Sequence, residues 1–216
     1  AVTEIENLPE IVGVMDKLSY DIASSLFLQI NPKKDILKTS LSGAELSKLF
    51  TNIYRYISFA LSNEFAIWAE RYNLNVHELI KIVNYNYPRA NIPIPGFVGG
   101  PCLSKDGILL DNNTTFSTIV STAWKVNESI PMYIVNNLKN IIGNLFGKKI
   151  AVLGLSFKSG SDDLRNSPSV KLVEILCSLG ANTLVHDPYV KSTLPLSEVL
   201  KKPDIIVIAT NHKEFK

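Results

Sequence analysis

Residues 150–155 read IAVLGL, a short apolar run with the length and composition of a buried strand. Helical spacing follows over 169–179, and TLVHD at 183–187 and IIVIAT at 205–210 are two further candidate strands, with a short helix expected near 196–201. Strand, helix, strand, helix, strand is the order of a parallel sheet with crossover helices. Residues 148–216 are therefore predicted to form a small α/β domain. Because such a sheet normally continues beyond its third strand, we expect this domain to be incomplete at its C-terminus.

The part of the chain before residue 148 shows helical spacing instead. Apolar residues from 9 to 30 recur every three or four positions until Asn31-Pro32, which predicts a first helix. Ser42 and Glu45 have the spacing of a capping box, which predicts the start of a long helix over 43–72. Residues 1–147 are therefore predicted to form a helical domain in front of the α/β domain.

Shorter helical segments complete the predicted helical domain. Asn75 predicts a capped helix that ends near Tyr85. Beyond the polar stretch 111–115 another helix is expected, with Pro131 as a break or a restart.

The predicted long helix has apolar side chains on more than one face, whereas a helix with one side in water is polar on that side. They include Leu46, Phe50, Tyr54, Ile57, Leu61, Phe65 and Trp68. Such a helix needs burial on several sides, and we expect a second copy of the chain to supply part of it in a homodimer.

Composition narrows the class of protein. The 216 residues are 46% hydrophobic and 19% charged, which is typical of a globular protein, and the net charge of +2 does not favour nucleic acid or an anionic membrane as a partner. Two widely separated cysteines do not suggest a disulfide framework. With neither a membrane-spanning run nor the pattern of a signal peptide, the sequence predicts a cytoplasmic location.

The sequence PRANIPIPGFVGGPCLSKD at 88–106 breaks every periodicity and predicts a structured loop. Within it, Gly99 and Gly100 precede Cys102 and allow a backbone approach to a bound molecule that side chains would block. The nearby Lys105 would favour the thiolate, which is the nucleophilic form of Cys102. A small buried hydrophobe beside a turn is the alternative interpretation of this cysteine.

Other side chains give weaker signals. Lys48 and Asn52 are one helical turn apart, so both can point to one spot, although a solvated face is the alternative. Arg89 could pair with a carboxylate or phosphate, and it could equally be an ordinary surface residue. Cys177 lies among apolar residues of a predicted helix and is expected to be an inert core residue.

The loop after the first strand of the α/β domain carries candidate anion ligands. Lys158 and Arg165 lie in it, and Ser167-Pro168 predicts an N-cap with proline at the first helical position. A plain strand-to-helix loop is the alternative, and Asp162 and Asp163 argue partly against a phosphate beside them.

The sequence does not support an NAD site at the first turn of the α/β domain, and no metal site is predicted in the chain. Asp187 ends the second strand, where dinucleotide folds place a ribose-binding carboxylate, but the first turn reads GLSFKSG and lacks G-x-G-x-x-G. His77, His186 and His212 share no metal-ligand spacing with one another or with either cysteine.

Three blocks in this order resemble the UDP-glucose/GDP-mannose dehydrogenase family, over nearly the whole chain. AELSKLFTNIYRYISFALSNE at 44–64 is similar to the start of the family's long central helix. PGFVGGPCLSKD at 95–106 is similar to its catalytic loop, commonly P-G-x-G-x-G-G-x-C-x-x-K-D. VLGLSFKSGSDDLRNSP at 152–168 resembles its C-terminal motif, G-L-x-F-K followed by D-D-x-R-x-S-P.

The resemblance implies an architecture. Family members have an N-terminal Rossmann domain for NAD, a central helical dimerisation domain and a C-terminal Rossmann-like domain that helps to bind the nucleotide sugar. Residues 1–147 and 148–216 would then be the central and C-terminal domains, without the N-terminal NAD domain. This chain alone is not expected to turn over.

The resemblance also implies roles for residues. Cys102 would attack the C6 aldehyde formed by a first oxidation of a UDP-sugar, giving a thiohemiacetal that a second NAD oxidises to a thioester. Lys48 and Asn52 would hold the oxyanion or a water, and Asp106 would assist hydrolysis. Substrate contacts would come from Arg89, Gly99, Gly100, Lys105 and Lys158, and a cofactor contact from Arg165.

Some features depart from the family pattern or stay open. The catalytic loop is slightly shorter than the common form, and Ser104 stands where proline is frequent. The sequence leaves open whether the substrate is UDP-glucose or UDP-N-acetylmannosamine. A non-catalytic dimerisation and sugar-nucleotide-binding module is the alternative function.

Overall fold

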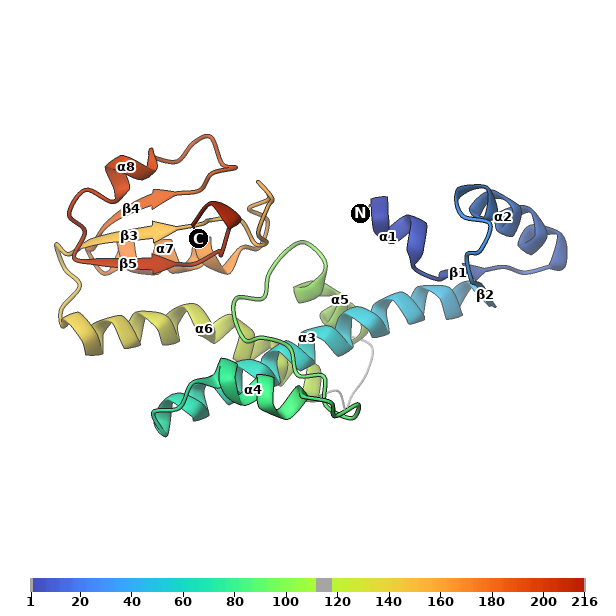
Figure 1. Ribbon diagram of the computed structural model, residues 1–216, viewed down its shortest axis with the longest axis horizontal. Helices are drawn as coiled ribbons and strands as arrows, with labels where there is room; N and C mark the ends of the chain where they lie inside the picture. The colour runs from blue at the N-terminus through green and yellow to red at the C-terminus, as the bar shows by residue number, and fades with distance from the viewer. Residues whose placement is uncertain (1, 112–117, 216) are drawn as a thin grey trace. The chain divides into compact units, whose positions relative to one another are not determined.

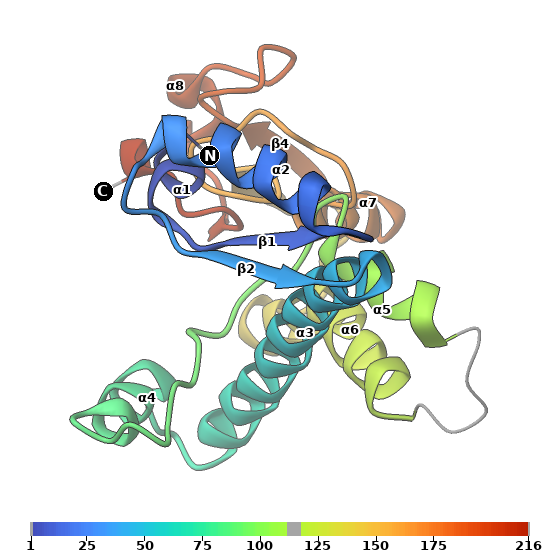
Figure 2. The same ribbon diagram turned by 90° about the vertical axis from the view of Figure 1, so that its right-hand side faces the viewer.

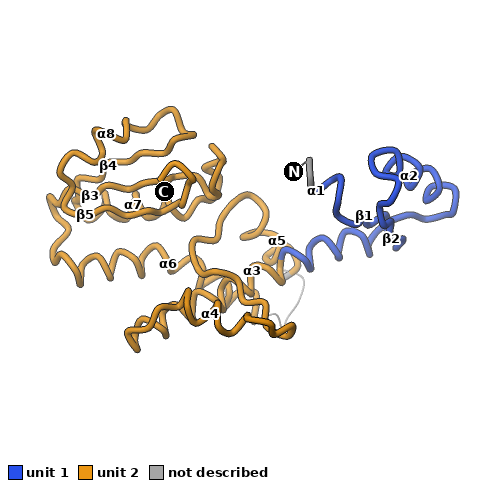
Figure 3. The backbone as a smooth tube through the Cα atoms, in the orientation of Figure 1, with its two compact units in different colours: residues 1–52 blue, residues 53–216 orange. Residues whose placement is uncertain are grey.

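The computed structural model describes residues 2–111 and 118–215, and it divides the chain into two compact units, 1–52 and 53–216 (Figure 3). No helix among these described residues is both long and apolar enough to cross a bilayer. The predicted polar stretch at 111–115 lies largely outside the described residues.

The unit of residues 1–52 contains α1 (Val2–Asn7), β1 (Glu10–Gly13), α2 (Lys17–Ile30) and β2 (Ile36–Thr39). β1 and β2 pair in parallel, and α2 lies over one side of them (Figure 2). The first helix was predicted over residues 9–30, and the prediction is wrong for the first part of that range. The β-branched Ile11 and Val12 lie in a strand, and the helix starts only where Asp16 accepts a hydrogen bond from the Ser19 N–H, at 2.7 Å.

The long helix, α3 (Leu41–Arg71), confirms the prediction over 43–72. Its cap differs from the predicted one. Ser40 Oγ accepts from the Gly43 N–H at 3.1 Å, so the capping residue is Ser40, where β2 has just ended, and not Ser42. A capping side chain accepts a hydrogen bond from the N–H group two or three residues further along the chain, at the start of the helix. Ser42 already lies inside the helix.

The remaining helices of the unit of residues 53–216 are partly as predicted. α4 (Val76–Asn84) starts after Asn75, whose side chain accepts from the His77 N–H at 2.9 Å, as predicted. α5 (Leu103–Asp111) lies in a region predicted to be loop up to residue 106. α6 (Thr118–Ile142) continues through Pro131 as one helix.

The predicted parallel sheet is confirmed. β3 (Lys149–Leu153), α7 (Pro168–Ser178), β4 (Asn182–His186), α8 (Leu196–Val199) and β5 (Ile205–Ile208) follow in that order, and a short 3-10 turn, η1 (Lys213–Phe215), comes last. The strand order is β4-β3-β5, with both pairs parallel (Figure 1). β3 is the central strand, and Ile150, Ala151 and Val152 in it are fully buried, as expected for a parallel sheet.

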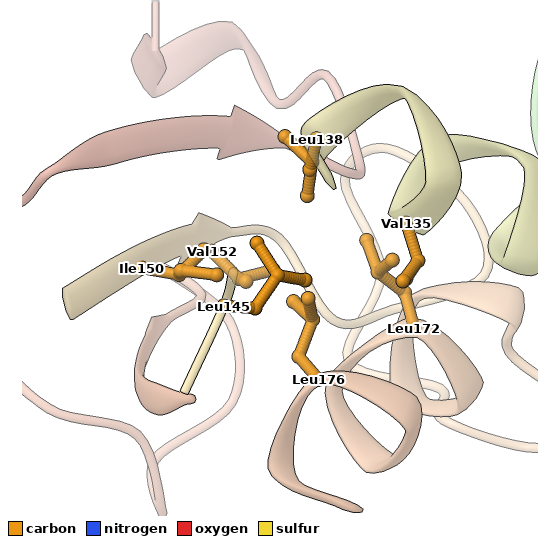
Figure 4. Close-up of a cluster of buried hydrophobic side chains, with 7 residues drawn as sticks. All are labelled: Val135, Leu138, Leu145, Ile150, Val152, Leu172 and Leu176. Carbon is orange, nitrogen blue, oxygen red and sulfur yellow. The ribbon is translucent and has the colours of Figure 1, made fainter. Parts of the chain in front are cut away.

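One apolar cluster joins the sheet to the helices around it. Figure 4 shows side chains from α6, α7 and β3 meeting in it. Its buried members are Val135, Leu138, Leu145, Ile150, Val152, Leu172 and Leu176. α6 therefore belongs to the helical region at its start and to the core of the α/β layer at its end. An ion pair between Lys171 of α7 and Glu128 of α6 adds to this contact.

Cys177 was predicted to be an inert core residue, and that prediction is wrong because its side chain is exposed. On α7, Leu172 and Leu176 are four residues apart and both face the cluster. Cys177 follows Leu176 by one position, a rotation of about 100°, which turns it away from the core.

We predict that Leu176→Ala lowers the free energy of unfolding by about 3 kcal/mol, because it removes buried methyl groups from a closely packed cluster. Cys177→Ser is the matched control on the same helix and should change it by less than about 0.5 kcal/mol. Urea denaturation of both variants measures the difference, and equal losses would contradict the assigned orientation of α7.

Candidate active site around Cys102

The loop before Cys102 is attached to α3 at its start. Ser62 Oγ donates a hydrogen bond to the Pro93 carbonyl at 2.5 Å. Asn63 pairs with both backbone groups of Gly96: its Nδ2 donates to the carbonyl at 3.1 Å, and its Oδ1 accepts from the N–H at 2.8 Å. Sequence analysis missed both side chains, because nothing in a single sequence tells which polar residue of a helix faces inward.

The end of the loop packs against the α/β layer. The Gly100 N–H donates to the Asn166 carbonyl at 3.2 Å. A Cβ on Gly99 would lie 2.4 Å from that same carbonyl oxygen, and a Cβ on Gly100, where φ is +98°, would lie 2.8 Å from the Phe157 ring. Both glycines are therefore required by close packing within the chain.

Cys102 is exposed and lies directly before α5. Its carbonyl accepts hydrogen bonds from the N–H groups of Lys105 at 3.2 Å and Asp106 at 3.0 Å, which is the pattern of the first helical turn. The alternative interpretation of Cys102, a buried hydrophobe, is excluded by its exposure.

Two other predicted residues share this turn. Asp106 is 4% exposed and follows Cys102 by four residues, in the first turn of α5. Lys105 is exposed.

Arg165 lies within electrostatic reach of the thiol. The pKa of its guanidinium is raised, first by hydrogen bonding to Asp163 and also by the charge of Cys102. Arg165 Nη2 is 2.6 Å from Asp163 Oδ2, and these hydrogen bonds lower the pKa of Asp163 to about 2. Of the predicted residues, Arg165 is thus the one that the α/β layer brings near Cys102.

Lys158 is exposed in a loop that buried polar contacts hold in place. Asp187 Oδ2 accepts from the N–H groups of Leu155 at 2.7 Å and Ser156 at 3.0 Å. Burial acts to raise the pKa of Asp187, but these two N–H groups and that of Tyr189 outweigh it, so the pKa is lowered. The Asp187 carboxylate is therefore occupied by hydrogen bonds within the protein.

His212, which sequence analysis did not single out, completes this support. It is fully buried, and its Nε2 lies 3.1 Å from both Asp187 Oδ2 and Ser156 Oγ. Its Nδ1 accepts from the Gly160 N–H at 3.1 Å. The residues after β5 therefore hold the loop that carries Lys158.

The predicted cap of α7 is confirmed. Ser167 Oγ accepts from the Ser169 N–H at 3.3 Å, and Pro168 takes the first helical position. Ser167 Oγ also donates to the Leu155 carbonyl at 2.6 Å and is buried. The N-terminus of α7 is thus capped by its own side chain.

The other predicted residues lie elsewhere in the chain. Lys48 is exposed and Asn52 half-buried, one turn apart on α3, in the unit of residues 1–52. Arg89 borders a hollow of about 430 Å³, and the residues described around it include none of the other predicted site residues. Within residues 2–111 and 118–215, no three His, Cys, Asp or Glu side chains gather as a metal ion would require.

Comparison with known proteins identifies the family. The pattern of the central domain of the UDP-glucose/GDP-mannose dehydrogenase family matches residues 42–129, and that of its UDP binding domain matches residues 151–216. The chain belongs to the UDP-glucose/GDP-mannose dehydrogenase family. The resemblance inferred from three blocks of sequence is thereby confirmed.

Individual family members are similar along nearly the whole chain. A UDP-N-acetyl-D-mannosamine dehydrogenase of Pyrococcus horikoshii is 38% identical over 95% of this chain and 50% of its own length. One from Campylobacter jejuni is 34% identical over 99% of this chain and 56% of its own length. The chain therefore spans about half the length of the curated relatives that it matches.

Solved structures of the family show the same fold. The structure of the UDP-D-ManNAc dehydrogenase of Pyrococcus horikoshii superposes with a TM-score of 0.87 at 36% identity, over 99% of this chain and 52% of that one. A UDP-glucose dehydrogenase of Pyrobaculum islandicum gives a TM-score of 0.80 at 26% identity, over 95% of this chain and 51% of that one. The predicted arrangement, a helical region followed by a parallel-sheet region, is that of this dehydrogenase family.

We predict that Gly99→Ala destabilises the family's cysteine loop in this chain by about 2 kcal/mol, because its Cβ would overlap the Asn166 carbonyl and the Pro168 ring. Ser104→Ala, in the same region, loses only a 3.4 Å contact to the Gly100 carbonyl and should cost less than about 0.5 kcal/mol. Thermal unfolding compares the two variants. Equal midpoints would show that the loop is not packed as described.

Proposed function

We propose that the complete protein oxidises C6 of a UDP-N-acetylhexosamine, of the UDP-N-acetylmannosamine type, to the uronate with NAD as the oxidant. The observation that carries the proposal is the exposed Cys102 at the N-terminus of α5, inside a loop that resembles the family's catalytic loop. The substrate class is supported by the names of the most similar relatives, which are UDP-N-acetyl-D-mannosamine dehydrogenases.

In this proposal Cys102 acts as a nucleophile. Its thiolate sulfur adds to the C6 aldehyde of the sugar, and the carbonyl oxygen becomes an oxyanion that takes a proton. When bound, two NAD molecules would each accept one hydride, the first from C6 of the alcohol to give the aldehyde and the second from the thiohemiacetal, whose hydroxyl proton goes to solvent, to give a thioester. Water then cleaves the thioester, which releases the carboxylate and returns the thiol. Lys48 and Asn52, on one face of α3, stabilise the oxyanion, and Asp106 positions the water.

The turn after β3 lacks the usual features of an NAD site. The turn after β3 lacks the glycine fingerprint, and the Asp187 carboxylate, which would hold a ribose, is occupied by the Leu155 and Ser156 N–H groups. We therefore propose that NAD is bound by a domain outside these 216 residues, and that Arg165 contacts it from this side.

The nucleotide-sugar ligand is supported by the match of residues 151–216 to the family's UDP binding domain. We propose that Lys158 and Lys105, both exposed, contribute positive charge to the diphosphate. Gly99 and Gly100 have no side chains, so the sugar nucleotide can approach the backbone beside Cys102. Arg89 reaches the sugar nucleotide from a second subunit.

The alternative function is a non-catalytic module for dimerisation and sugar-nucleotide binding. Under this alternative, UDP-sugars bind the complete protein without reduction of NAD.

We predict that Cys102→Ser lowers uronate formation by the complete protein by roughly a thousandfold, because the alcohol is a far weaker nucleophile than the thiolate. Cys177→Ser is the control, since Cys177 is the second exposed thiol and lies on the outside of α7. NADH formation with UDP-N-acetylmannosamine and with UDP-glucose measures both variants and the substrate preference. Full turnover by Cys102→Ser would overturn the proposal.

We also propose that the chain is a homodimer through α3 and α4. Several large apolar side chains of α3 are more than a third exposed, among them Leu61 at 46% and Trp68 at 51%. Between α3 and α4 lies an apolar hollow of about 450 Å³ lined by Phe65, Trp68, Leu79 and Val83, among others. Exposed apolar surface of this kind is typical of a protein interface.

We predict that sedimentation gives the mass of a dimer and that Trp68→Glu raises the dimer dissociation constant at least about tenfold, because it puts a charge in the apolar hollow. Lys125→Glu, on the exposed side of α6, is the control and should leave it unchanged. A monomeric mass for the unchanged chain at micromolar concentration would contradict the proposal.

A further inference from the structure

The buried side-chain amide of Asn63 on α3 is hydrogen-bonded to the loop that carries Cys102. Asn63 is 2% exposed, and its carboxamide pairs with both the N–H and the carbonyl of Gly96, as a neighbouring strand would. An alanine at this position would remove both hydrogen bonds to the Gly96 backbone, so this contact helps to determine where the loop lies.

A second buried amide fixes the orientation of the first. Asn127 of α6 is also 2% exposed, and its Oδ1 accepts from Asn63 Nδ2 at 3.0 Å. Asn127 Nδ2 in turn donates to the Tyr56 carbonyl at 3.2 Å. Both Nδ2 hydrogens of Asn63 are thus used, one for Gly96 and one for Asn127. If the Asn63 carboxamide were turned over, its oxygen would face the Gly96 carbonyl and Asn127 Oδ1, which both accept hydrogen bonds and cannot donate to it. Only one orientation is therefore possible.

The same centre is closed to water. Tyr56 is 2% exposed, and burial is the main reason why the pKa of its phenol is raised to about 12. Tyr56 packs with Ala60, Val98 and Ala123 around the two amides. In such surroundings a hydrogen bond is stronger than in water, which strengthens the bond between the two amides.

The loop between Gly96 and Cys102 is held by further contacts along its length. After Gly96, Phe97 packs against the apolar cluster of the α/β layer, and Val98 is buried beside Tyr56. The Gly100 N–H is bound by Asn166, and α5 begins directly after Cys102. A shift at Gly96 is therefore transmitted to the first turn of α5.

We propose that Asn63, oriented by Asn127, is a positioning residue that sets where the Cys102 thiol stands. It touches no substrate and acts only through the loop 96–102. The kinetic part of the proposal rests on the proposed function of Cys102, whereas the placement of the loop does not.

Hydrogen exchange tests the placement of the loop in this chain without any activity. In Asn63→Ala, exchange should become roughly tenfold faster at the N–H groups of Lys105 and Asp106, which bind the Cys102 carbonyl, because the first turn of α5 loses its fixed start. Asn127→Ala keeps both bonds to Gly96 and should give a smaller increase. If Asn63→Ala does not fold, Asn127→Ala serves as the test variant in its place.

The chain offers a matched control. Asn84 of α4 makes the same paired contact with the backbone of Ile92, at 2.9 and 3.0 Å, four residues before Gly96. Asn84→Ala removes the same chemistry upstream of the attachments at Ser62 and Asn63, so exchange at Lys105 should not change. Unchanged exchange in Asn63→Ala, or an equal increase in Asn84→Ala, would overturn the proposal.

Kinetics of the complete protein distinguish positioning from a general loss of structure. Asn63→Ala should lower kcat roughly tenfold and change KM for the UDP-sugar by less than about twofold, because the nucleotide contacts remain while the thiol is displaced. Faster exchange together with an unchanged kcat would support the placement of the loop, and it would count against Cys102 as the nucleophile of the proposed function.

Discussion

The packing of α6 against α7 and β3 is the contact on which the unit of residues 53–216 depends. α6 starts beside α3, where Ala123 is buried with Tyr56, and ends in the α/β core, where Val135 and Leu138 meet Leu172. One continuous helix thus belongs to two layers of structure and fixes the distance between them. The cysteine loop, which is attached to both layers, has both of its ends held as a result.

The two attachments of that loop rely on different kinds of interaction. On the α3 side they are hydrogen bonds from buried Ser62 and Asn63 to backbone groups, which specify position because hydrogen bonds are directional. On the α/β side they are close van der Waals contacts that only glycine permits, at Gly99 and Gly100. Together they leave an exposed thiol on a rigid support, which is what a nucleophile needs if it is to react in one geometry.

Several buried polar residues of the α/β layer have structural roles. Asp187 and His212 are buried and hold the loop of Lys158, and Ser167 caps α7 and reaches back to Leu155. Buried polar groups need partners within the protein, and here the partners are backbone groups of the turns after β3. The charged side chains of that loop, Lys158 and Arg165, are exposed.

The sequence by itself determined the parallel sheet, the long helix, the family and the loop of Cys102, because period, glycine and proline content and motif order are local properties of a chain. Only the tertiary structure decided that Glu10–Gly13 is a strand, that Ser40 is the cap and that Cys177 is exposed. It alone also showed that Asn63, Asn127 and His212 support the site. A short apolar segment fits a strand or a helix equally well, and a polar side chain points inward or outward according to partners that lie far away in sequence, which only packing brings together.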